Sequence, residues 1–267
     1  MACIATEPLD WHEALARYRY PFSLRAFSGR NRFGREWFDL SFEAGNRAET
    51  TQFEEHFREH AASRLEPWYE VVFWKMFSQG RRDFQTERTI DRIVKKKTSA
   101  GDLWSHCAAY VERETRDSFS RFQDLLIKSE SIAIAFTFPA FCCPSRFPMV
   151  DTRIAKYVAS EGSRLEFPSK PEIEKTLKRY REGSKEVLTM RDWPFVEAWV
   201  DWCRKMAERL SADGKCVWRA RDVEMAVFRA WGEPQERKDC SHGKPRYILV
   251  DESQEDQKAS SSFNSHT

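Results

Sequence analysis

Residues 125–158 read LLIKSESIAIAFTFPAFCCPSRFPMVDTRIAKYV, and they predict an ordered series of four elements. A polar turn at residues 128–131 leads into the solidly apolar segment Ile132–Phe138, which Pro139 is expected to end. After a loop rich in Cys, Pro and Arg, Asp151 stands directly before residues with amphipathic helical spacing, and Asp is a favoured helix N-cap. The stretch therefore predicts a turn, a buried helix, a loop and a second helix that begins at Asp151.

The rest of the chain also has helical periodicity. Apolar residues recur at helical spacing in residues 51–65, 193–210 and 218–231, and residues 67–78 are apolar nearly all round, which is typical of a central, buried helix. Only 10 Gly and 11 Pro occur among 267 residues, fewer than a many-stranded fold needs for its turns. We therefore predict an all-α protein, with residues 233–267 as a polar, disordered tail.

Charge and cysteine usage limit the possible functions. The net charge is only +2, so nucleic-acid binding would require a local basic face. No apolar run approaches the roughly 18 residues of a membrane span, and the N-terminus lacks the features of a signal peptide. Seven cysteines without C-x-x-C spacing are typical of reduced thiols, so we expect a cytoplasmic protein without a cofactor.

The order of elements in residues 125–158 resembles that of the helix-hairpin-helix DNA glycosylase superfamily. In that family a hairpin of the type L-P-G-V-G-x-K/x-x-A precedes a buried helix, and a P-V-D-T-x-V-x-R-type segment then carries the catalytic Asp. Residues 148–158, PMVDTRIAKYV, are similar to the second motif, and Ser131-Ile132-Ala133 fits the end of the first. This chain departs from the family at the hairpin, where residues 127–130, IKSE, replace the glycine turn.

The resemblance implies a two-lobed helical domain over residues 1–232, with a central lobe at about 80–160 and a second lobe formed by the N-terminal and C-terminal helices. We expect a monomer. It also implies a DNA repair glycosylase, an enzyme that hydrolyses the N-glycosidic bond of a flipped base, with Asp151 as the catalytic carboxylate. Bifunctional members use a Lys near the hairpin's end as a Schiff-base nucleophile. Ser131 occupies that place here, so the resemblance implies a monofunctional N-glycosylase. The spaced cysteines of iron–sulfur members are absent, and no cluster is expected.

Duplex DNA is the partner that the resemblance implies, and the hairpin turn is the first place to look for its contacts. Lys128, Ser129 and Ser131 are expected to bind phosphate at the start of the buried helix. In the family, a Gln after an earlier buried helix often enters the duplex, and Gln79 has that position; it could equally be a plain helix end.

A loop rich in Arg and aromatic residues supplies the other predicted DNA contacts. Arg30 and Arg32 lie beside Phe and Trp residues, a combination that suits phosphates and unstacked bases. The alternative is a solvated loop whose aromatic side chains pack on the core.

Two other functions remain open at this point. Because the glycine turn is absent, the protein could be a non-enzymatic nucleic-acid-binding member on the same scaffold, with Asp151 only a helix cap. Residues 56–60, HFREH, also have the H-x-x-E-H pattern of inverted zinc peptidases, which would make it a zinc hydrolase using His56 and His60. Since no further acidic ligand can be identified, we predict that both histidines are structural and that no metal is bound.

Because Asn also caps helices, Asp151→Asn is expected to change stability by less than about 1 kcal/mol.

Overall fold

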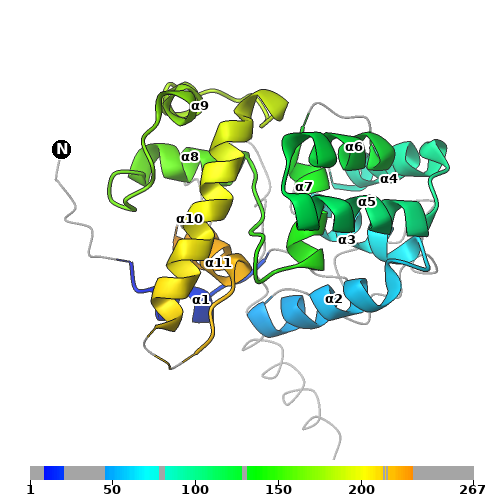
Figure 1. Ribbon diagram of the computed structural model, residues 1–267, viewed down its shortest axis with the longest axis horizontal. Coiled ribbons are helices and arrows are strands. Elements are labelled where there is room, and N and C mark those ends of the chain that lie inside the picture. Colours follow the sequence, from blue (N-terminus) through cyan, green and yellow to red (C-terminus); the bar gives the residue numbers. More distant parts are fainter. Residues whose placement is uncertain are drawn as a thin grey trace, which may run out of the picture. The chain divides into compact units, whose positions relative to one another are not determined.

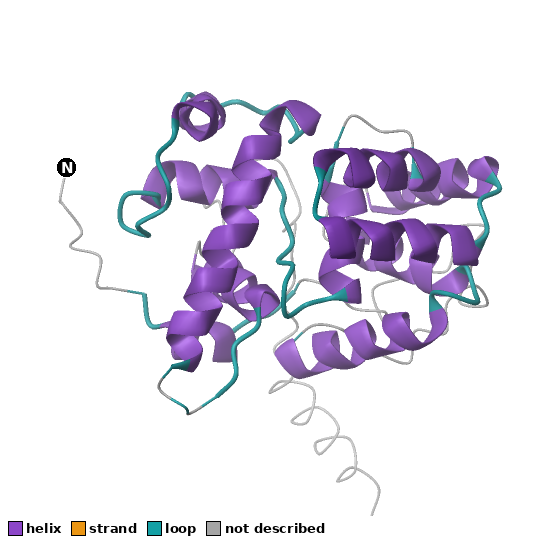
Figure 2. Cartoon of the chain, in the orientation of Figure 1, coloured by secondary structure: helices purple, strands orange, loops and turns teal. Residues whose placement is uncertain are grey.

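The computed structural model describes residues 9–20, 46–77, 82–127, 131–212, 214 and 216–230. All of these lie in Met1–Glu233, the first of two units into which the chain divides. Every regular element in the described ranges is helical, and these ranges contain no strand (Figure 2). The predicted all-α fold is thus confirmed. None of the helices found there combines the length and the apolar character that crossing a membrane requires.

The helices form two groups, which are visible in Figure 1. The first helical group consists of α2 (Arg47–His60), α3 (Glu66–Phe77), α4 (Arg82–Lys96), α5 (Ala100–Arg113), α6 (Arg116–Leu126) and α7 (Ala133–Cys142). The second helical group consists of α1 (Trp11–Ala16), α8 (Thr152–Glu161), α9 (Pro171–Arg181), the short 3₁₀ helix η3 (Met190–Asp192), α10 (Trp193–Ser211) and α11 (Ala220–Ala230). The N-terminal helix α1 packs on the last helix, α11, so the second group is built from both ends of the described chain.

Polar side chains fix where several helices begin. Asn46 and Glu49 form a reciprocal capping box at the start of α2, in which each side chain accepts the other residue's backbone N–H. Ser99 and Thr115 cap α5 and α6 by accepting backbone N–H groups of the first turn. Glu114 ends α5 in a left-handed conformation, with φ of 56°. These local contacts set the boundaries within which the apolar faces pack.

Helix α7 is the buried helix that the sequence predicts, but it extends farther than expected. Pro139 lies inside the helix, so the prediction that Pro139 ends it is wrong. Proline cannot donate the usual backbone hydrogen bond to the preceding turn. The helix nevertheless continues to Cys142 because Phe138, Ala140 and Phe141 are all fully buried, and the apolar area they remove from water offsets the lost bond. Helix α7 packs on α2, α3, α5 and α6 and is central to the first group.

A buried ionic network joins the two groups through α2 and α11. Arg219 Nη1 lies 2.6 Å from Glu54 Oε2, and Arg221 Nε lies 3.6 Å from the other oxygen of Glu54. Glu54 and Arg221 are fully buried. The network comprises three cationic and three anionic side chains: Arg47, Arg219, Arg221, Glu54, Asp222 and Glu224. The charges therefore balance, as buried ions require.

Candidate functional site

Asp151 is held at the start of α8 by a rigid approach segment. Phe147, Met149 and Val150 are buried, and the indole N–H of Trp199 in α10 donates to the Met149 carbonyl over 2.9 Å. Asp151 follows in an extended conformation. Its Oδ1 accepts the backbone N–H groups of Arg153 and Ile154, in the first turn of α8, at 2.9 and 3.0 Å. The predicted N-cap is thus present, and it fixes the orientation of the carboxylate.

The other oxygen of this carboxylate contacts a lysine from the first helical group. Lys75 Nζ, in the last turn of α3, lies 3.2 Å from Asp151 Oδ2. The Lys75 side chain is only 7% exposed, whereas that of Asp151 is 24% exposed. The ammonium is therefore nearly enclosed, while part of the carboxylate remains open to solvent. This pair joins α3 to α8, and so brings the two helical groups together at Asp151.

The surroundings of Asp151 favour its charged form. Burial by itself raises the pKa of this carboxyl, but the charge of Lys75 and the hydrogen bond from the Ile154 amide act in the opposite direction. The net result is a pKa below the usual value for Asp. Asp151 is therefore a carboxylate at neutral pH, with a fixed orientation and a partly exposed surface.

Aromatic side chains support the charged residues on both sides of the pair. Tyr20 stacks on Trp74 with ring centroids 4.2 Å apart, and its hydroxyl donates to the Lys75 carbonyl over 3.1 Å. On the other side, the guanidinium of Arg153 lies 4.8 Å from the ring centroid of Phe228 in α11. The pair is thus supported by residues from α3, α8, α11 and the segment after α1.

Lys75 is the residue at this site that the sequence analysis did not single out. The helix predicted over residues 67–78 is apolar nearly all round, and it corresponds to α3. Within that run Glu70 and Lys75 are the charged residues, and both are buried. A buried charge in an otherwise apolar helix requires a partner, so the sequence does indicate that Lys75 contacts an acidic or polar group. The sequence does not show that the partner is Asp151.

Most of the predicted DNA contacts lie outside the described residues: Gln79, Lys128, Ser129, Arg30 and Arg32. Ser131 is described, and it lies two residues before Ala133, the first residue of α7. Its hydroxyl accepts the Ala133 N–H at 3.4 Å, and its carbonyl accepts from the Gln123 side chain at 3.1 Å. The next N–H, that of Ile132, donates to the Leu188 carbonyl over 3.0 Å. The start of α7 is thus tied to α6 and to the segment before η3.

His56 and His60 lie against one another on α2, with ring centroids 4.8 Å apart. His56 Nε2 is 3.0 Å from Glu70 Oε2 in α3, and this carboxylate is the acidic neighbour that the sequence did not identify. In the part of the chain that the structure describes, no three His, Cys, Asp or Glu side chains are arranged to hold a metal ion. The observed arrangement is a contact between α2 and α3, made by a histidine and a buried carboxylate.

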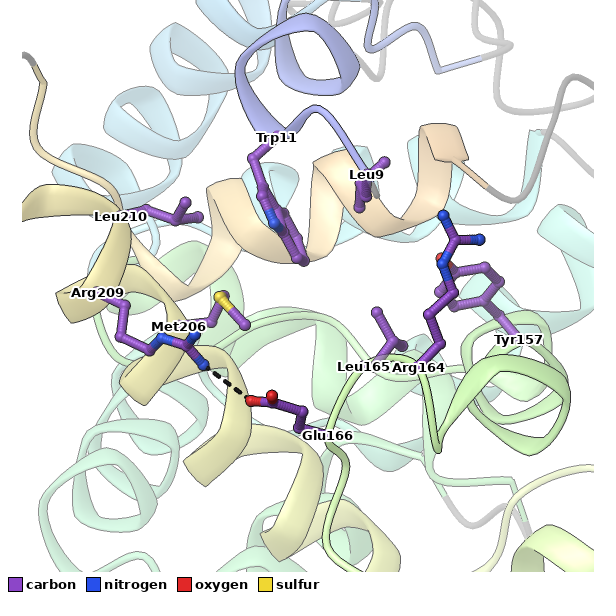
Figure 3. A pocket seen from close by; sticks show the side chains of 9 residues that line it. All are labelled: Leu9, Trp11, Tyr157, Arg164, Leu165, Glu166, Met206, Arg209 and Leu210. Atoms are coloured by element: carbon purple, nitrogen blue, oxygen red, sulfur yellow. Dashed lines mark hydrogen bonds and ion pairs between the residues drawn. The ribbon is translucent and has the colours of Figure 1, made fainter. Parts of the chain in front are cut away.

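A cavity of about 450 Å³ lies within the second helical group (Figure 3). Its wall combines apolar side chains with a rim ion pair, in which Arg209 Nη1 is 3.3 Å from Glu166 Oε2. The lining residues are Leu9, Trp11, Tyr157, Arg164, Leu165, Glu166, Met206, Arg209 and Leu210. Asp151 is not among them, so this cavity is separate from the carboxylate at the start of α8.

Comparison of the chain with protein-family models, with curated proteins and with solved structures gives no match.

Proposed function

We propose that this protein is a monofunctional DNA N-glycosylase of the helix-hairpin-helix type, with Asp151 as its catalytic carboxylate. One observation carries the proposal: Asp151 is ionised, rigidly oriented and partly exposed at the point where two helical groups meet. The similarity of PMVDTRIAKYV to the family's Asp-bearing segment, which likewise follows a buried helix, supports the same assignment.

The electrostatics of Asp151 suit one catalytic role better than another. Cleavage of an N-glycosidic bond develops positive charge on the sugar, and a fixed carboxylate beside the anomeric carbon stabilises that charge. A general base works best when its pKa is near the operating pH. Because the pKa of Asp151 is lowered, we assign it mainly to stabilising the cationic sugar, and only secondarily to accepting a proton from water.

Lys75 acts in this proposal as a positioning residue. Its ammonium holds Asp151 Oδ2, while the two backbone amides hold Oδ1, so both oxygens of the carboxylate are fixed before substrate arrives. Such fixed orientation is worth more in catalysis than charge alone. Lys75 is also the amine in direct contact with Asp151. A borohydride-trapping experiment must therefore test whether Lys75 only positions Asp151 or itself attacks the sugar as a nucleophile.

The decisive experiment uses duplex oligonucleotides that each carry one damaged base. Purified protein is incubated with the panel, and alkali then cleaves the strand wherever a base has been released. We expect Asp151→Asn to lower the rate of base release by at least about a hundredfold, because a neutral amide cannot stabilise a cation. Asp10→Asn makes the same change at the N-cap of α1 and serves as the matched control, with no loss expected.

Three results would contradict parts of this proposal. Full base release by Asp151→Asn would leave Asp151 as a helix cap only. A borohydride-trapped adduct that is formed by wild type and lost in Lys75→Met would make the enzyme bifunctional, with Lys75 as the nucleophile. No base release from any lesion in the panel would remove the enzymatic function.

In that last case, a nucleic-acid-binding protein on the same scaffold becomes the better assignment. The observation that favours it is that both oxygens of Asp151 already have partners within the protein. Duplex binding that is the same in wild type and in Asp151→Asn, without base release by either, would support this second function.

A further inference from the structure

The cavity of the second helical group has an apolar interior that three separate segments build. Leu9 and Trp11 come from the start of α1, Leu165 from the turn after α8, and Met206 and Leu210 from the end of α10. In Figure 3 the Trp11 side chain points toward the space between Met206 and Leu165. A volume of about 450 Å³ with apolar and aromatic walls is typical of a site for a small molecule.

Contacts behind the walls hold the cavity in its shape. The indole N–H of Trp202 donates to the Leu165 carbonyl over 3.0 Å, and the ring centroids of Trp202 and Trp11 are 6.1 Å apart. Gly162 lets the turn after α8 close tightly, because an added Cβ would lie 2.6 Å from a backbone oxygen of that helix. The Phe167 N–H returns to the Gly162 carbonyl over 2.9 Å. The cavity is thus formed before any ligand enters it.

Among the three charged residues that line the cavity, Arg164 is the least exposed. Its side chain is 37% exposed, whereas those of Arg209 and Glu166 are mostly exposed and pair with each other. The partner of Arg164 is Glu161, and the distance of 3.7 Å between Nη1 and Oε2 is longer than a hydrogen bond. Figure 3 shows Arg164 and Arg209 on opposite sides of Trp11. The guanidinium of Arg164 can therefore direct its N–H donors to an anion in the cavity.

We propose that this cavity binds a small aromatic carboxylate, with its ring against Trp11 and its carboxylate on Arg164. Contact with an indole and with the Met206 thioether both stabilise a flat ring. A guanidinium binds a carboxylate through two parallel N–H groups. Solvent screens the pair with Glu161, so a ligand carboxylate can replace that of Glu161. The proposal is independent of the function proposed for Asp151, which does not line the cavity.

Glu166 limits the charge of the ligand to a single negative group. Its Oε2 lies 3.3 Å from Arg209 Nη1, so this pair at the rim is neutral. A ligand with a second anionic group would bring that group toward the Glu166 carboxylate, and a ligand cation would meet Arg164. One uncharged ring with one carboxylate is therefore the chemistry that the cavity fits best.

The test compares three indole compounds with different charge: indole-3-acetate, neutral indole-3-acetamide and cationic tryptamine. Isothermal titration calorimetry measures their Kd for the full chain. We expect indole-3-acetate to bind with a Kd below about 1 mM. It should bind at least about tenfold more tightly than the amide, because only the acid forms a charge-assisted pair with Arg164. Tryptamine should bind more weakly than the amide.

Two arginine variants test the carboxylate contact. Arg164→Met keeps a long apolar side chain, and it should weaken binding of indole-3-acetate by about tenfold while leaving the amide unchanged. Arg181→Met is the matched control: Arg181 also pairs with a glutamate and is partly exposed, but it does not line the cavity. Its affinities should equal those of wild type. A preference for the acid that survives in Arg164→Met would overturn the assignment of Arg164.

Two tryptophan variants test the place of binding. Leu210→Trp puts a second indole into the cavity and should abolish binding of both the acid and the amide. Val217→Trp adds the same ring at a position that is 80% exposed and outside the lining, so binding should be unchanged. Unchanged binding in a folded Leu210→Trp, or no binding of indole-3-acetate to wild type, would overturn the proposal. If Leu210→Trp fails to fold, the titrations of wild type and Arg164→Met still decide it.

Discussion

Two ionic contacts join the same two helical groups, and they are built differently. Between α2 and α11, Glu54 and Arg221 are fully buried within a network of balanced charge. Between α3 and α8, Lys75 is nearly enclosed but its partner Asp151 keeps 24% of its side-chain surface exposed. In the first contact Glu54 and Arg221 are closed to any ligand, whereas the second contact leaves a carboxylate that an outside molecule can approach.

The two contacts also differ in the hydrogen-bond partners that each carboxylate would keep if its cation were removed. Glu54 depends on arginine side chains in a region without solvent, and burial raises its pKa despite those neighbours. Asp151 would keep two backbone N–H donors and its contact with water if Lys75 moved away. A carboxylate that can exchange its partner is suited to function, and one that cannot is suited to holding the fold.

The largest expected effect is the loss of Arg221. Arg221→Met keeps a long, unbranched side chain but removes one of the three cations, so that Glu224 loses its arginine partner and Glu54 keeps only Arg219. We expect the free energy of unfolding, measured by urea denaturation, to fall by about 3–5 kcal/mol. A loss below about 1 kcal/mol would show that the network is not essential to the fold.

A smaller effect is expected at the exposed pair. We expect Lys75→Met and Asp151→Asn each to lower the free energy of unfolding by about 1–3 kcal/mol, because each removes a charge-assisted hydrogen bond. The sequence predicts less than about 1 kcal/mol for Asp151→Asn from capping alone, and the contact with Lys75 raises this expectation. The double variant tests the coupling: its loss should be smaller than the two single losses added together.

The pH dependence of stability should distinguish Asp151 from its amide. Because the pKa of Asp151 in the folded protein is below its ordinary value of 3.8, its contribution to stability is present above that pH and is lost as pH falls through the folded-state pKa. The difference in free energy of unfolding between wild type and Asp151→Asn should therefore shrink as pH falls below 3.8. A constant difference between neutral pH and pH 3 or so would mean that the charge of Asp151 does not stabilise the fold.

The smallest effect is expected at the rim of the cavity in the second group. Arg209 and Glu166 form an ion pair whose side chains are 65% and 76% exposed. Arg209→Met should change the free energy of unfolding by less than about 0.5 kcal/mol, because solvent screens such a pair. Urea denaturation of this variant and of Arg221→Met compares the free energy of unfolding lost with an exposed arginine and with a buried one.

Prediction from the sequence is correct where structure depends on near neighbours. The all-α fold, the buried helix α7 and the N-cap at Asp151 all follow from periodicity and capping within a few residues. It failed where the decisive contact is distant, since Lys75 and Asp151 are 76 residues apart. It also failed at Pro139, where burial of the surrounding aromatic side chains outweighs a local rule.

The link between α2 and α11 has a consequence for the order in which the protein is made. Glu54 and Arg219 are separated by 165 residues. At the usual pace of translation, roughly 8–30 s pass between their synthesis. In the course of that interval the helices from α2 to α7 are completed, while Glu54 still lacks the arginines that pair with it. Among the described helices α11 is therefore the last to be made, and a chain that stops before Arg219 leaves Glu54 without its arginine partners.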